Sequence, residues 1–559
     1  METIKKILTS IYGNTLQQQD LAELSDLILT AKAAITRSRK LHWDEEDIVL
    51  ITYADQFSED NRPTLETFTG FYNRWLKNTF SLVHLLPFYP YSSDDGFSVI
   101  DYHQVNPVAG DWQHVAELNR STRLMFDYVC NHISAQSSWF QGYLAQQPEY
   151  DDHFIEMDPE TDLHQVTRPR TSPLLTPFML ANGDTRYIWT TFSADQIDLN
   201  FASPAVLKRM VDVLLTYLAR GGDYIRLDAV GYMWKEPGTS CIHLEKTHLL
   251  VKLFRAIADF VAPGTVLITE TNVPHRDNIS YFGQGDEAQM VYQFPLPPLV
   301  LHAIHRGEAG TLSRWAASLE TPAAGCTFFN FLSSHDGIGL NPLRGLLPEE
   351  EILVLAQAME NQGARVSYKN NPDGSASPYE INVTYLDALN KQDDDDALRV
   401  RRFMLAHAIL LAFPGVPAIY IQSLLGSRND DEGVMLSGHN RAINRQKYPL
   451  SDIEPQISGG NTLRTDIFVG LRHLIALRKT LPAFHPDSAM QVITLDSAVL
   501  AFRRTDKNNH TLLCLFNVSD RPITVTLPEN NYLDAISGQE ITGDHAFTLQ
   551  PYAYYWLHS

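Results

Sequence analysis

The stretch Tyr224–Lys235, "YIRLDAVGYMWK", begins with an apolar run that contains two charged side chains, Arg226 and Asp228. Residues two apart on a β-strand point to the same side, so Arg226 and Asp228 are expected to lie next to each other. A buried strand that ends by aiming a charge pair in one direction predicts a polar site at that end.

Eight short runs rich in branched and aromatic residues alternate with longer amphipathic segments. They are "IVLITYAD" from Ile48, "LVHLLPF" from Leu82, "RLMFDYVCNH" from Arg123, "DYIRLDA" from Asp223, "TVLITET" from Thr265, "QMVYQF" from Gln289, "CTFFNFLSSHD" from Cys326 and "PAIYIQS" from Pro417. Apolar strands that alternate with helices indicate a parallel sheet covered on both faces. Eight of them predict an α/β protein with a (β/α)₈ TIM barrel.

The remaining segments predict domains around this barrel. Apolar residues at helical spacing indicate an N-terminal helical arm over residues 1–46. The barrel is expected in three parts, residues 47–132, 203–337 and 392–482. The intervals 133–202 and 338–391 are too long for simple crossovers, so they are predicted to form an inserted B domain and a B′ excursion. Short alternating strands over 483–559 predict a C-terminal antiparallel β domain.

The bulk composition excludes several classes of protein. With 44 basic and 66 acidic residues, the formal net charge is −22. A chain this acidic is poorly suited to bind nucleic acid or an anionic membrane, which favours a small-molecule substrate. The N-terminus lacks a signal-peptide pattern, and no apolar run reaches membrane-spanning length, so the expected location is cytoplasmic.

No segment predicts a metal site or a bound cofactor. The four cysteines form no C-x-x-C pair, which indicates neither a zinc site nor a disulfide framework. The acidic run Asp393–Asp396 is interpreted as a solvated helix start rather than a metal site. The glycines of "GQGDEA" from Gly283 lack the third glycine and the strand-to-helix context of a nucleotide-binding fingerprint.

Polar side chains follow several of the predicted strands. Any one of them could be a separate structural group, but the carboxyl ends of barrel strands meet on one face, where active sites lie. Acidic residues at the ends of the fourth, fifth and seventh strands together therefore predict one pocket. The strand-end residues are Asp127, Asn131, His132, Arg226, Asp228, Glu270, His335 and Asp336.

Three converging carboxylates suit glycoside chemistry. A retaining enzyme uses one carboxylate as nucleophile and a second, about 5–5.5 Å away, as acid/base. Asp228 is the predicted nucleophile, and Arg226 beside it is expected to lower its pKa. Glu270 is the predicted acid/base, since its apolar neighbours and the nearby carboxylates should raise its pKa. Asp336 is expected to stabilise positive charge on the sugar in the transition state.

The chain also resembles a known family. The segments "DYVCNH", "YIRLDA", "LITET" and "FLSSHD" resemble, in order, the four conserved regions of the α-amylase superfamily (glycoside hydrolase family 13). "HLLPFYPYSSDDGFSVIDY", "KEPGTSC", "LPPLVLHA", "HDGIGL" and "NRAINR" are similar to its sucrose-phosphorylase-like subgroup. The resemblance covers about residues 47–450. Within the subgroup, the N-terminal arm and the overall length most resemble the glucosylglycerate phosphorylases of bacteria.

The resemblance implies roles for further residues. It makes Asp228, Glu270 and Asp336 the catalytic triad. The residues implied to hold the glucose unit are Asp94, Phe97, His132, Arg226, Tyr232, His335 and Arg441, with Phe97 and Tyr232 as an aromatic platform. The residues implied for phosphate or acceptor are Arg170, Asn272, Tyr379 and Glu380. Arg168, the other arginine of "RPR", could join Arg170 in holding phosphate in bidentate form. No metal or organic cofactor is implied.

Two differences from the sucrose phosphorylases bear on the identity of the acceptor. Sucrose phosphorylases have a histidine where this chain has Asn272, and a glutamine where it has Glu380. Both positions belong to the acceptor side, so the glucose side is unaffected while sucrose itself becomes doubtful as substrate. Tyr224 replaces the glycine of the amylase motif G-x-R-x-D, but the subgroup shares that tyrosine.

The expected function is retaining phosphorolysis of an α-glucoside. The favoured substrates are 2-O-α-D-glucosyl-D-glycerate and inorganic phosphate, and the products would be α-D-glucose 1-phosphate and D-glycerate. Sucrose phosphorylase and sucrose 6-phosphate phosphorylase stay open as alternatives. Hydrolysis or transglucosylation stays open as well, because the triad does not choose between water and phosphate. A non-catalytic amylase-like binding protein should have lost a triad member, and none is missing here. The oligomeric state is left open.

Overall fold

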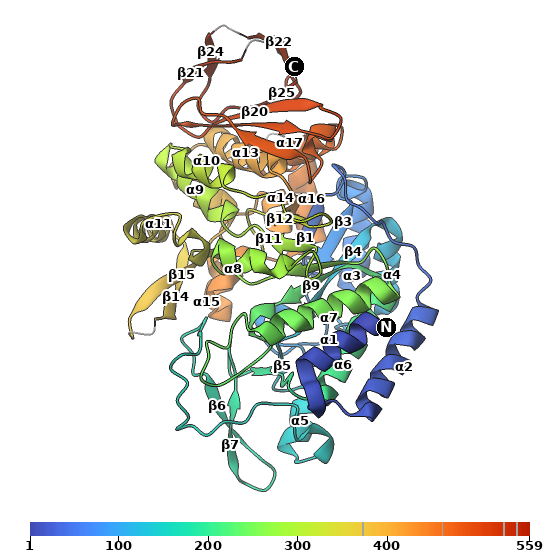
Figure 1. Cartoon of the computed structure of the whole chain (residues 1–559). Helices are drawn as coiled ribbons and strands as arrows, with labels where there is room; N and C mark the ends of the chain where they lie inside the picture. Colours follow the sequence, from blue (N-terminus) through green and yellow to red (C-terminus); the bar gives the residue numbers. More distant parts are fainter. Residues whose placement is uncertain (372–373, 461, 529–530, 544–545, 559) are drawn as a thin grey trace.

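Eight parallel strands close into a barrel at the centre of the computed structural model, which confirms the predicted fold class (Figure 1). The structure describes residues 1–371, 374–460, 462–528, 531–543 and 546–558. In chain order the barrel strands are β1 (Val49–Thr52), β3 (Leu82–Leu85), β4 (Arg123–Val129), β9 (Gly222–Asp228), β10 (Val266–Thr269), β11 (Met290–Tyr292), β12 (Thr327–Asn330) and β16 (Val416–Tyr420). Each overlaps one of the eight predicted runs.

The register of β9 explains why its charged residues meet those of its neighbours. All seven residues of β9 are buried. The strand runs between β4 and β10, and Arg226 pairs with Asp127 on one side and Ile268 on the other. Because these strands are parallel, their carboxyl ends lie on the same face of the barrel. That face receives Asp228 and the residues that follow β10.

Helices cover the outside of the barrel. Their amphipathic sequences bury one face against the strands, as α6 does with nine buried residues, and its N-terminus is capped by Ser203. Asp395 caps α13 in the same way, so the acidic run does begin a helix. The covering helices are α3 (Thr64–Phe71), α4 (Trp112–Ser121), α6 (Pro204–Ala219), α7 (Glu245–Val261), α8 (His275–Ile279), α9 (Leu296–Arg306), α10 (Gly310–Ala317), α13 (Asp396–Ala412), α14 (Ile421–Leu424), α16 (Leu450–Ser458) and α17 (Leu463–Arg478).

Two helices occupy the predicted N-terminal arm. Helices α1 (Glu2–Tyr12) and α2 (Gln18–Ala34) pack on α6 and α7 (Figure 1). The Tyr12 hydroxyl donates to the Phe201 carbonyl at 2.8 Å. Beyond α2, Arg37 and Arg39 both pair with the buried Asp223 at the start of β9. The arm is thus fixed to the outside of the barrel by apolar contacts and by buried charge.

Two long excursions leave the carboxyl face of the barrel after its third and seventh strands, as the predicted fold class has them. The first contains β5 (His132–Ser134), α5 (Ser138–Leu144), β6 (Leu175–Met179), β7 (Thr185–Trp189) and β8 (Gln196–Asp198). The second contains β13 (Ile338–Gly339), α11 (Glu349–Asn361), β14 (Arg365–Asn370), β15 (Ala376–Asn382) and α12 (Tyr385–Ala388). A short sheet of order β13-β15-β14 holds the second excursion together. The segment after β16 adds α15 (Asp431–Ser437).

Antiparallel strands form the C-terminal region, at the top of Figure 1. One sheet has the order β18-β19-β20-β25-β22-β23, and β21 pairs with β24. The buried Arg504 of β19 donates to the Ala412 carbonyl at the end of α13, which ties this region to the barrel. The strands are β18 (Ala489–Val492), β19 (Val499–Thr505), β20 (Thr511–Asn517), β21 (Ile523–Thr526), β22 (Asn531–Asp534), β23 (Glu540–Thr542), β24 (Ala546–Leu549) and β25 (Tyr554–His558).

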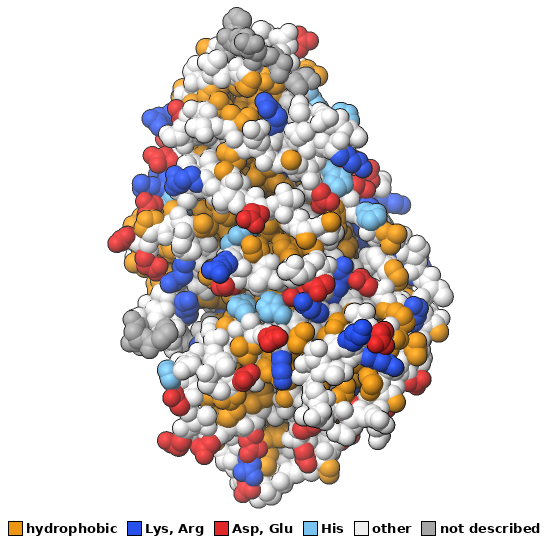
Figure 2. All heavy atoms as spheres, in the orientation of Figure 1, with side chains coloured by type: hydrophobic (Ala, Val, Ile, Leu, Met, Phe, Trp, Pro, Cys, Tyr) orange, Lys and Arg blue, Asp and Glu red, His pale blue; other side chains and the backbone are white. Residues whose placement is uncertain are grey.

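The surface mixes charges of both signs. On the face drawn in Figure 2, acidic and basic side chains are interspersed, with hydrophobic side chains between them. The net charge of −22 is therefore not gathered into one acidic field on that face. Within the described ranges, no helix is long and apolar enough to cross a membrane.

Candidate active site

A cavity of about 60 Å³ opens at the carboxyl ends of the barrel strands. It brings together thirteen of the fifteen residues to which the sequence assigns a catalytic, glucose or acceptor role, from the segments that follow the barrel strands, including both excursions. These are Asp94, Phe97, His132, Arg170, Asp228, Tyr232, Glu270, Asn272, His335, Asp336, Tyr379, Glu380 and Arg441. Arg226 lies directly beneath this set, against Asp228, whereas Arg168 does not line the cavity.

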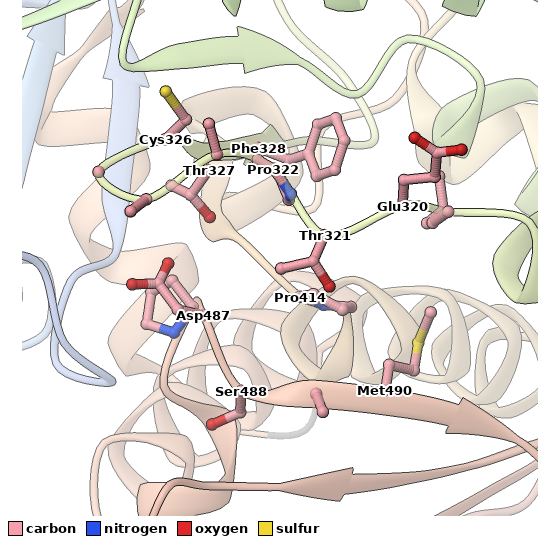
Figure 3. A pocket seen from close by; sticks show the side chains of 16 residues that line it. Glu320, Thr321, Pro322, Cys326, Thr327, Phe328, Pro414, Asp487, Ser488 and Met490 are labelled. Atoms are coloured by element: carbon pink, nitrogen blue, oxygen red, sulfur yellow. The ribbon is translucent and has the colours of Figure 1, made fainter. Parts of the chain in front are cut away.

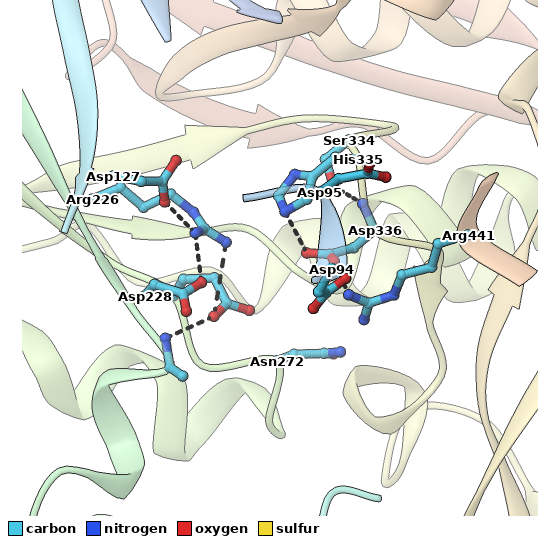
Figure 4. Close-up of polar contacts among 12 residues, drawn as sticks. Asp94, Asp95, Asp127, Arg226, Asp228, Asn272, Ser334, His335, Asp336 and Arg441 are labelled. Carbon is cyan, nitrogen blue, oxygen red and sulfur yellow. Dashed lines mark hydrogen bonds and ion pairs between the residues drawn. The ribbon is translucent and has the colours of Figure 1, made fainter. Parts of the chain in front are cut away.

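The guanidinium of Arg226 organises the floor of the cavity (Figure 4). Its Nη1 lies 2.5 Å from Asp127 Oδ1 and 2.7 Å from Asp228 Oδ1, and its Nη2 lies 3.8 Å from Glu270 Oε2. Its Nε donates to the Tyr292 hydroxyl at 3.0 Å. The side chain is almost fully buried. Its planar fork therefore holds the Asp228 carboxylate in place while it also approaches Glu270.

The two carboxyl groups nearest the cavity floor, Asp228 and Glu270, have perturbed acidities. Burial raises the pKa of Glu270 to about 7; Arg226 opposes this shift, and the charges of Asp228 and Asp336 add to it. This agrees with the sequence prediction for Glu270. Burial also raises the pKa of Asp228 above its ordinary value, and Arg226 only opposes that shift. Arg226 thus lowers the pKa of Asp228, as the sequence predicts, but burial outweighs it, and the sequence did not reveal how deeply this strand end is buried.

Asp336 lies in the opposite environment. Its Oδ1 is 2.6 Å from Arg441 Nη1, and its Oδ2 is 3.4 Å from His335 Nε2 (Figure 4). Its Oδ1 also lies 4.0 Å from Arg445 Nη2. Burial by itself would raise the pKa of Asp336, but these neighbours and Arg226 lower it well below its usual range. The cavity thus combines a carboxyl group that can hold a proton near neutral pH with one that stays ionised.

One wall of the cavity is aromatic and buried. The ring of Phe97 stacks on that of His335, with centroids 4.6 Å apart and planes 3° from parallel. His132 approaches the Phe97 carbonyl at 2.9 Å through its Nε2. Tyr232 also lines the cavity and meets the ring of Phe192 edge-on at 5.4 Å. Flat apolar rings with nearby polar groups suit the face and the hydroxyls of a sugar ring.

A second wall comes from the two excursions. The guanidinium carbon of Arg170 lies 5.4 Å from the ring centroid of Tyr379 and 5.5 Å from that of Phe192. The amide of Asn272 donates to the Tyr379 hydroxyl at 3.3 Å. Glu380 accepts two hydrogen bonds from Arg441, at 3.0 Å from Nε and 2.8 Å from Nη2. Arg441 is therefore held between Glu380 and Asp336.

Arg168 is the exception among the predicted residues. Its guanidinium donates to the Ser172 carbonyl within its own loop, which turns it away from the cavity that Arg170 lines. Of the two arginines that could hold phosphate together, only Arg170 lines the cavity.

Strained backbone collects around the cavity. Asp94, Asp95, Ala229 and Asn272 have φ angles of 52°, 47°, 51° and 42°. L-residues other than glycine seldom adopt this left-handed region, at a cost of about 1–3 kcal/mol each, and such residues cluster at functional sites. The local fold evidently holds these four residues in place for the orientation of their side chains.

Three side chains near the cavity were missed by the sequence reasoning. Arg445 donates to the His335 carbonyl at 2.8 Å and lies 2.9 Å from Asp95 and 3.4 Å from Asp94. It is the last arginine of "NRAINR", so the motif contained the signal, although the resemblance points only to Arg441. Phe192 and Gln196 line the cavity from the first excursion, where the sequence carries no pattern that singles them out.

A second and larger cavity lies away from these residues. It has a volume of about 180 Å³ and is lined by residues 319–328, Pro414 and 486–490 (Figure 3). These segments precede β12 and β16 and lead into β18, so the cavity lies at the amino ends of the barrel strands. Its acidic lining residues are Glu320 and Asp487 alone. Volume therefore does not identify the site, whereas the converging carboxylates do.

Comparison with known proteins places the chain in a family. The protein-family model for the alpha amylase catalytic domain matches residues 53–336. The family model for the maltogenic amylase C-terminal domain matches residues 490–556. A glucosylglycerate phosphorylase of Escherichia coli (strain K12) is 57% identical over 557 residues, covering 100% of both chains. A sucrose phosphorylase of Agrobacterium vitis is 32% identical, over 82% of this chain and 92% of the other.

The fold is matched by a solved structure as well. The crystal structure of sucrose 6F-phosphate phosphorylase from Thermoanaerobacter thermosaccharolyticum has a TM-score of 0.75 and 24% identity, covering 92% of this chain and 100% of that one. This supports the fold alone. The family model over half of the chain and the full-length relative carry the assignment: the chain belongs to the alpha-amylase family, glycoside hydrolase family 13, in the branch that contains the glucosylglycerate and sucrose phosphorylases.

Proposed function

We propose that the protein is a retaining glycoside phosphorylase, a hexosyltransferase that cleaves an α-glucoside with inorganic phosphate. The favoured substrate is 2-O-α-D-glucosyl-D-glycerate, and the products are α-D-glucose 1-phosphate and D-glycerate. The observation that carries this proposal is the set of three carboxyl groups, Asp228, Glu270 and Asp336, around one cavity in a chain 57% identical to a glucosylglycerate phosphorylase.

In the first step Asp228 acts as the nucleophile. A carboxylate oxygen attacks the anomeric carbon, the glycosidic C–O bond breaks, and Glu270 gives its proton to the departing oxygen. A pKa of about 7 for Glu270 supports this role, because the group is protonated in part of the population at neutral pH. Arg226, 2.7 Å from Asp228, keeps the nucleophile oriented and favours its ionised form.

In the second step phosphate replaces the departed acceptor. A phosphate oxygen attacks the anomeric carbon, the ester bond to Asp228 breaks, and Glu270 takes up the proton that phosphate loses. Two inversions give net retention, so an α-glucoside yields α-glucose 1-phosphate. In both steps the ionised Asp336 stabilises the positive charge that develops on the sugar ring.

The second wall of the cavity, which the two excursions form, is here called the acceptor wall. Its charges support phosphate over water as the second substrate. Phosphate must approach a cavity lined by five carboxyl groups, those of Asp94, Asp228, Glu270, Asp336 and Glu380, so it needs a cation that is not already neutralised. Arg441 is paired with Asp336 and Glu380, whereas the described ion pairs include none with Arg170. Arg170 lies over the ring of Tyr379 and is the proposed phosphate ligand.

The positive charge of Arg170 also supports an anionic acceptor. Glycerate carries a carboxylate, and phosphate and glycerate occupy this subsite in turn, so one arginine serves both. Asn272 and Tyr379 offer hydrogen-bonding groups for the hydroxyls. The 57% identity to a glucosylglycerate phosphorylase, against 32% to a sucrose phosphorylase, supports glycerate over fructose.

The test is an acceptor screen in the synthetic direction. Purified protein receives α-glucose 1-phosphate as donor, and phosphate release is followed with D-glycerate, fructose or fructose 6-phosphate as acceptor. We expect kcat/KM to be at least about tenfold higher for D-glycerate, equal to about 1.4 kcal/mol of transition-state preference. Preference for fructose or fructose 6-phosphate would move the protein to the corresponding sucrose branch. Absence of phosphate release with every acceptor would overturn phosphorolysis.

The proposal places the enzyme in the cytoplasm. Its four cysteines, Cys130, Cys241, Cys326 and Cys514, are buried and unpaired. Unpaired cysteines are the usual state in a reducing compartment.

A further inference from the structure

Two glycines of the segment "HDGIGL" lie where the acceptor wall meets the barrel. Gly337 and Gly339 flank Ile338 at the start of the second excursion, and Gly339 pairs with Glu380 across the β13–β15 ladder. Neither glycine has a positive φ angle, so both adopt backbone conformations that any residue can adopt. Their lack of a side chain must therefore be required for space and not for conformation.

The space at Gly339 is filled by Asn272. A Cβ atom built on Gly339 would lie 2.4 Å from Asn272 Oδ1 and 3.1 Å from both its Cγ and Nδ2. An ordinary van der Waals contact begins near 3.4 Å, so the amide occupies the position that a methyl group would take. Figure 4 shows Asn272 extending across the site from the loop that follows β10.

Few other contacts fix the orientation of the Asn272 side-chain amide. Its Oδ1 is buried and has no hydrogen-bond partner among the described residues, and its Nδ2 makes a single 3.3 Å bond to the Tyr379 hydroxyl. Its backbone is held in the left-handed region, with φ at 42°. The direction of this amide is thus set by the strained backbone on one side and by contact with Gly339 on the other.

We infer that Gly339 is a positioning residue of the acceptor subsite: its missing side chain lets the Asn272 amide lie against β13, beside Tyr379, and so sets the width of the subsite. This rests on the proposed function, because Asn272 faces the acceptor only if transfer occurs in this cavity. A methyl group at position 339 would meet the amide oxygen about 1 Å inside the ordinary contact distance of 3.4 Å, and so would displace the amide and disturb its bond to Tyr379.

Gly339 gives a cleaner test than Gly337. A Cβ atom on Gly337 would meet Glu380 Cγ at 2.4 Å but also the Ile381 carbonyl oxygen at 2.7 Å, so Gly337→Ala would distort the β13–β15 ladder itself. At Gly339 the three nearest atoms all belong to one side chain that can move. Gly339→Ala is therefore expected to fold and to act through Asn272.

The experiment measures how the glucosyl-enzyme partitions between acceptor and water. α-Glucosyl fluoride supplies the glucosyl group, since fluoride leaves without recognition by the acceptor subsite, and glucose and transfer product are quantified together. We expect Gly339→Ala to lower the ratio of transfer to hydrolysis about tenfold or more, with inorganic phosphate and with D-glycerate. Gly70→Ala is the matched control, because a Cβ atom there meets nothing within 4 Å.

A double-mutant comparison separates positioning from general damage. If Gly339→Ala acts by displacing the amide, it should change the ratio less than twofold in an Asn272→Ala background. The inference is overturned if Gly339→Ala lowers the ratio equally in both backgrounds, lowers transfer and hydrolysis together, or leaves the ratio unchanged. A wild-type protein that transfers glucose to neither phosphate nor D-glycerate would instead refute the proposed function, whatever the variants do.

Discussion

Replacing Arg170 by glutamine should separate phosphorolysis from hydrolysis. Arg170 is half-buried, its guanidinium lies over the rings of Tyr379 and Phe192, and the described ion pairs leave its charge without a carboxylate. Glutamine removes that charge and keeps a polar, shorter side chain. Phosphate then has to enter beside the catalytic carboxyl groups without the cavity arginine that lies outside the described ion pairs.

The size of the effect follows from the interaction between the guanidinium and phosphate, which the substitution removes. Removing one partner of a desolvated, hydrogen-bonded charge pair costs about 2–5 kcal/mol, which corresponds to roughly a 30-fold to several-thousand-fold decrease in kcat/KM for phosphate. Water carries no charge and should be affected far less. Arg170→Lys keeps the charge but not the planar fork, so we expect a value between those of the wild type and Arg170→Gln.

The assay follows glucose and glucose 1-phosphate formed from α-glucosyl fluoride over a range of phosphate concentrations. Arg168→Gln is the matched control, because Arg168 lies two residues away, does not line the cavity, and undergoes the same change of side chain. It should keep the wild-type ratio of the two products. The reasoning is refuted if Arg170→Gln reduces both products equally, or if the two glutamine variants behave alike.

The other predictions concern the triad. Asp228→Asn should lower turnover roughly 10⁴-fold or more, because an amide cannot form the glucosyl ester; retention of a tenth of the activity would contradict the assignment. Proton NMR of the first product formed from an α-glucoside should show the α-anomer of glucose 1-phosphate, and a β-phosphate would exclude the double displacement. Since Glu270 has a pKa of about 7 and must be protonated for the first step, kcat/KM for a glucoside should rise as pH falls through 7 and decline above it. α-Glucosyl fluoride needs little proton transfer to its leaving group, so its first step should show a much weaker decline, and equal declines would remove Glu270 from that role.

The barrel was predictable because its signal is local and repeated. Each buried strand is a continuous apolar run, as in β9, and eight such runs between helices specify one architecture. Strand-end residues such as Asp228, Glu270 and Asp336 were predictable for the same reason, since parallel strands deliver their carboxyl ends to one face. The C-terminal strands were predictable from their period-two pattern.

The features that could not be predicted depend on packing between distant segments. The burial that raises the pKa of Asp228 comes from the closed floor of the barrel and not from its neighbours in sequence. Arg168 and Arg170 are equivalent in sequence, and only the path of their loop separates the one bound to Ser172 from the one that lines the cavity. Phe192 reaches the site through the fold of the first excursion, which no periodic pattern describes.

Glu380 was the most difficult residue to interpret from the sequence, since a carboxylate beside an anion-binding subsite repels the ligand. Its two hydrogen bonds to Arg441 change that interpretation. Arg441 also contacts Asp336 at 2.6 Å, so without Glu380 its guanidinium would be free to swing toward an entering anion and leave Asp336. Glu380 is buried and paired, so its charge is offset where it lies and Arg441 remains on Asp336. Selectivity for a small anion would then follow from two separate roles: Glu380 and Arg441 keep the Asp336 carboxylate ionised, and Arg170 supplies the positive charge that the acceptor meets.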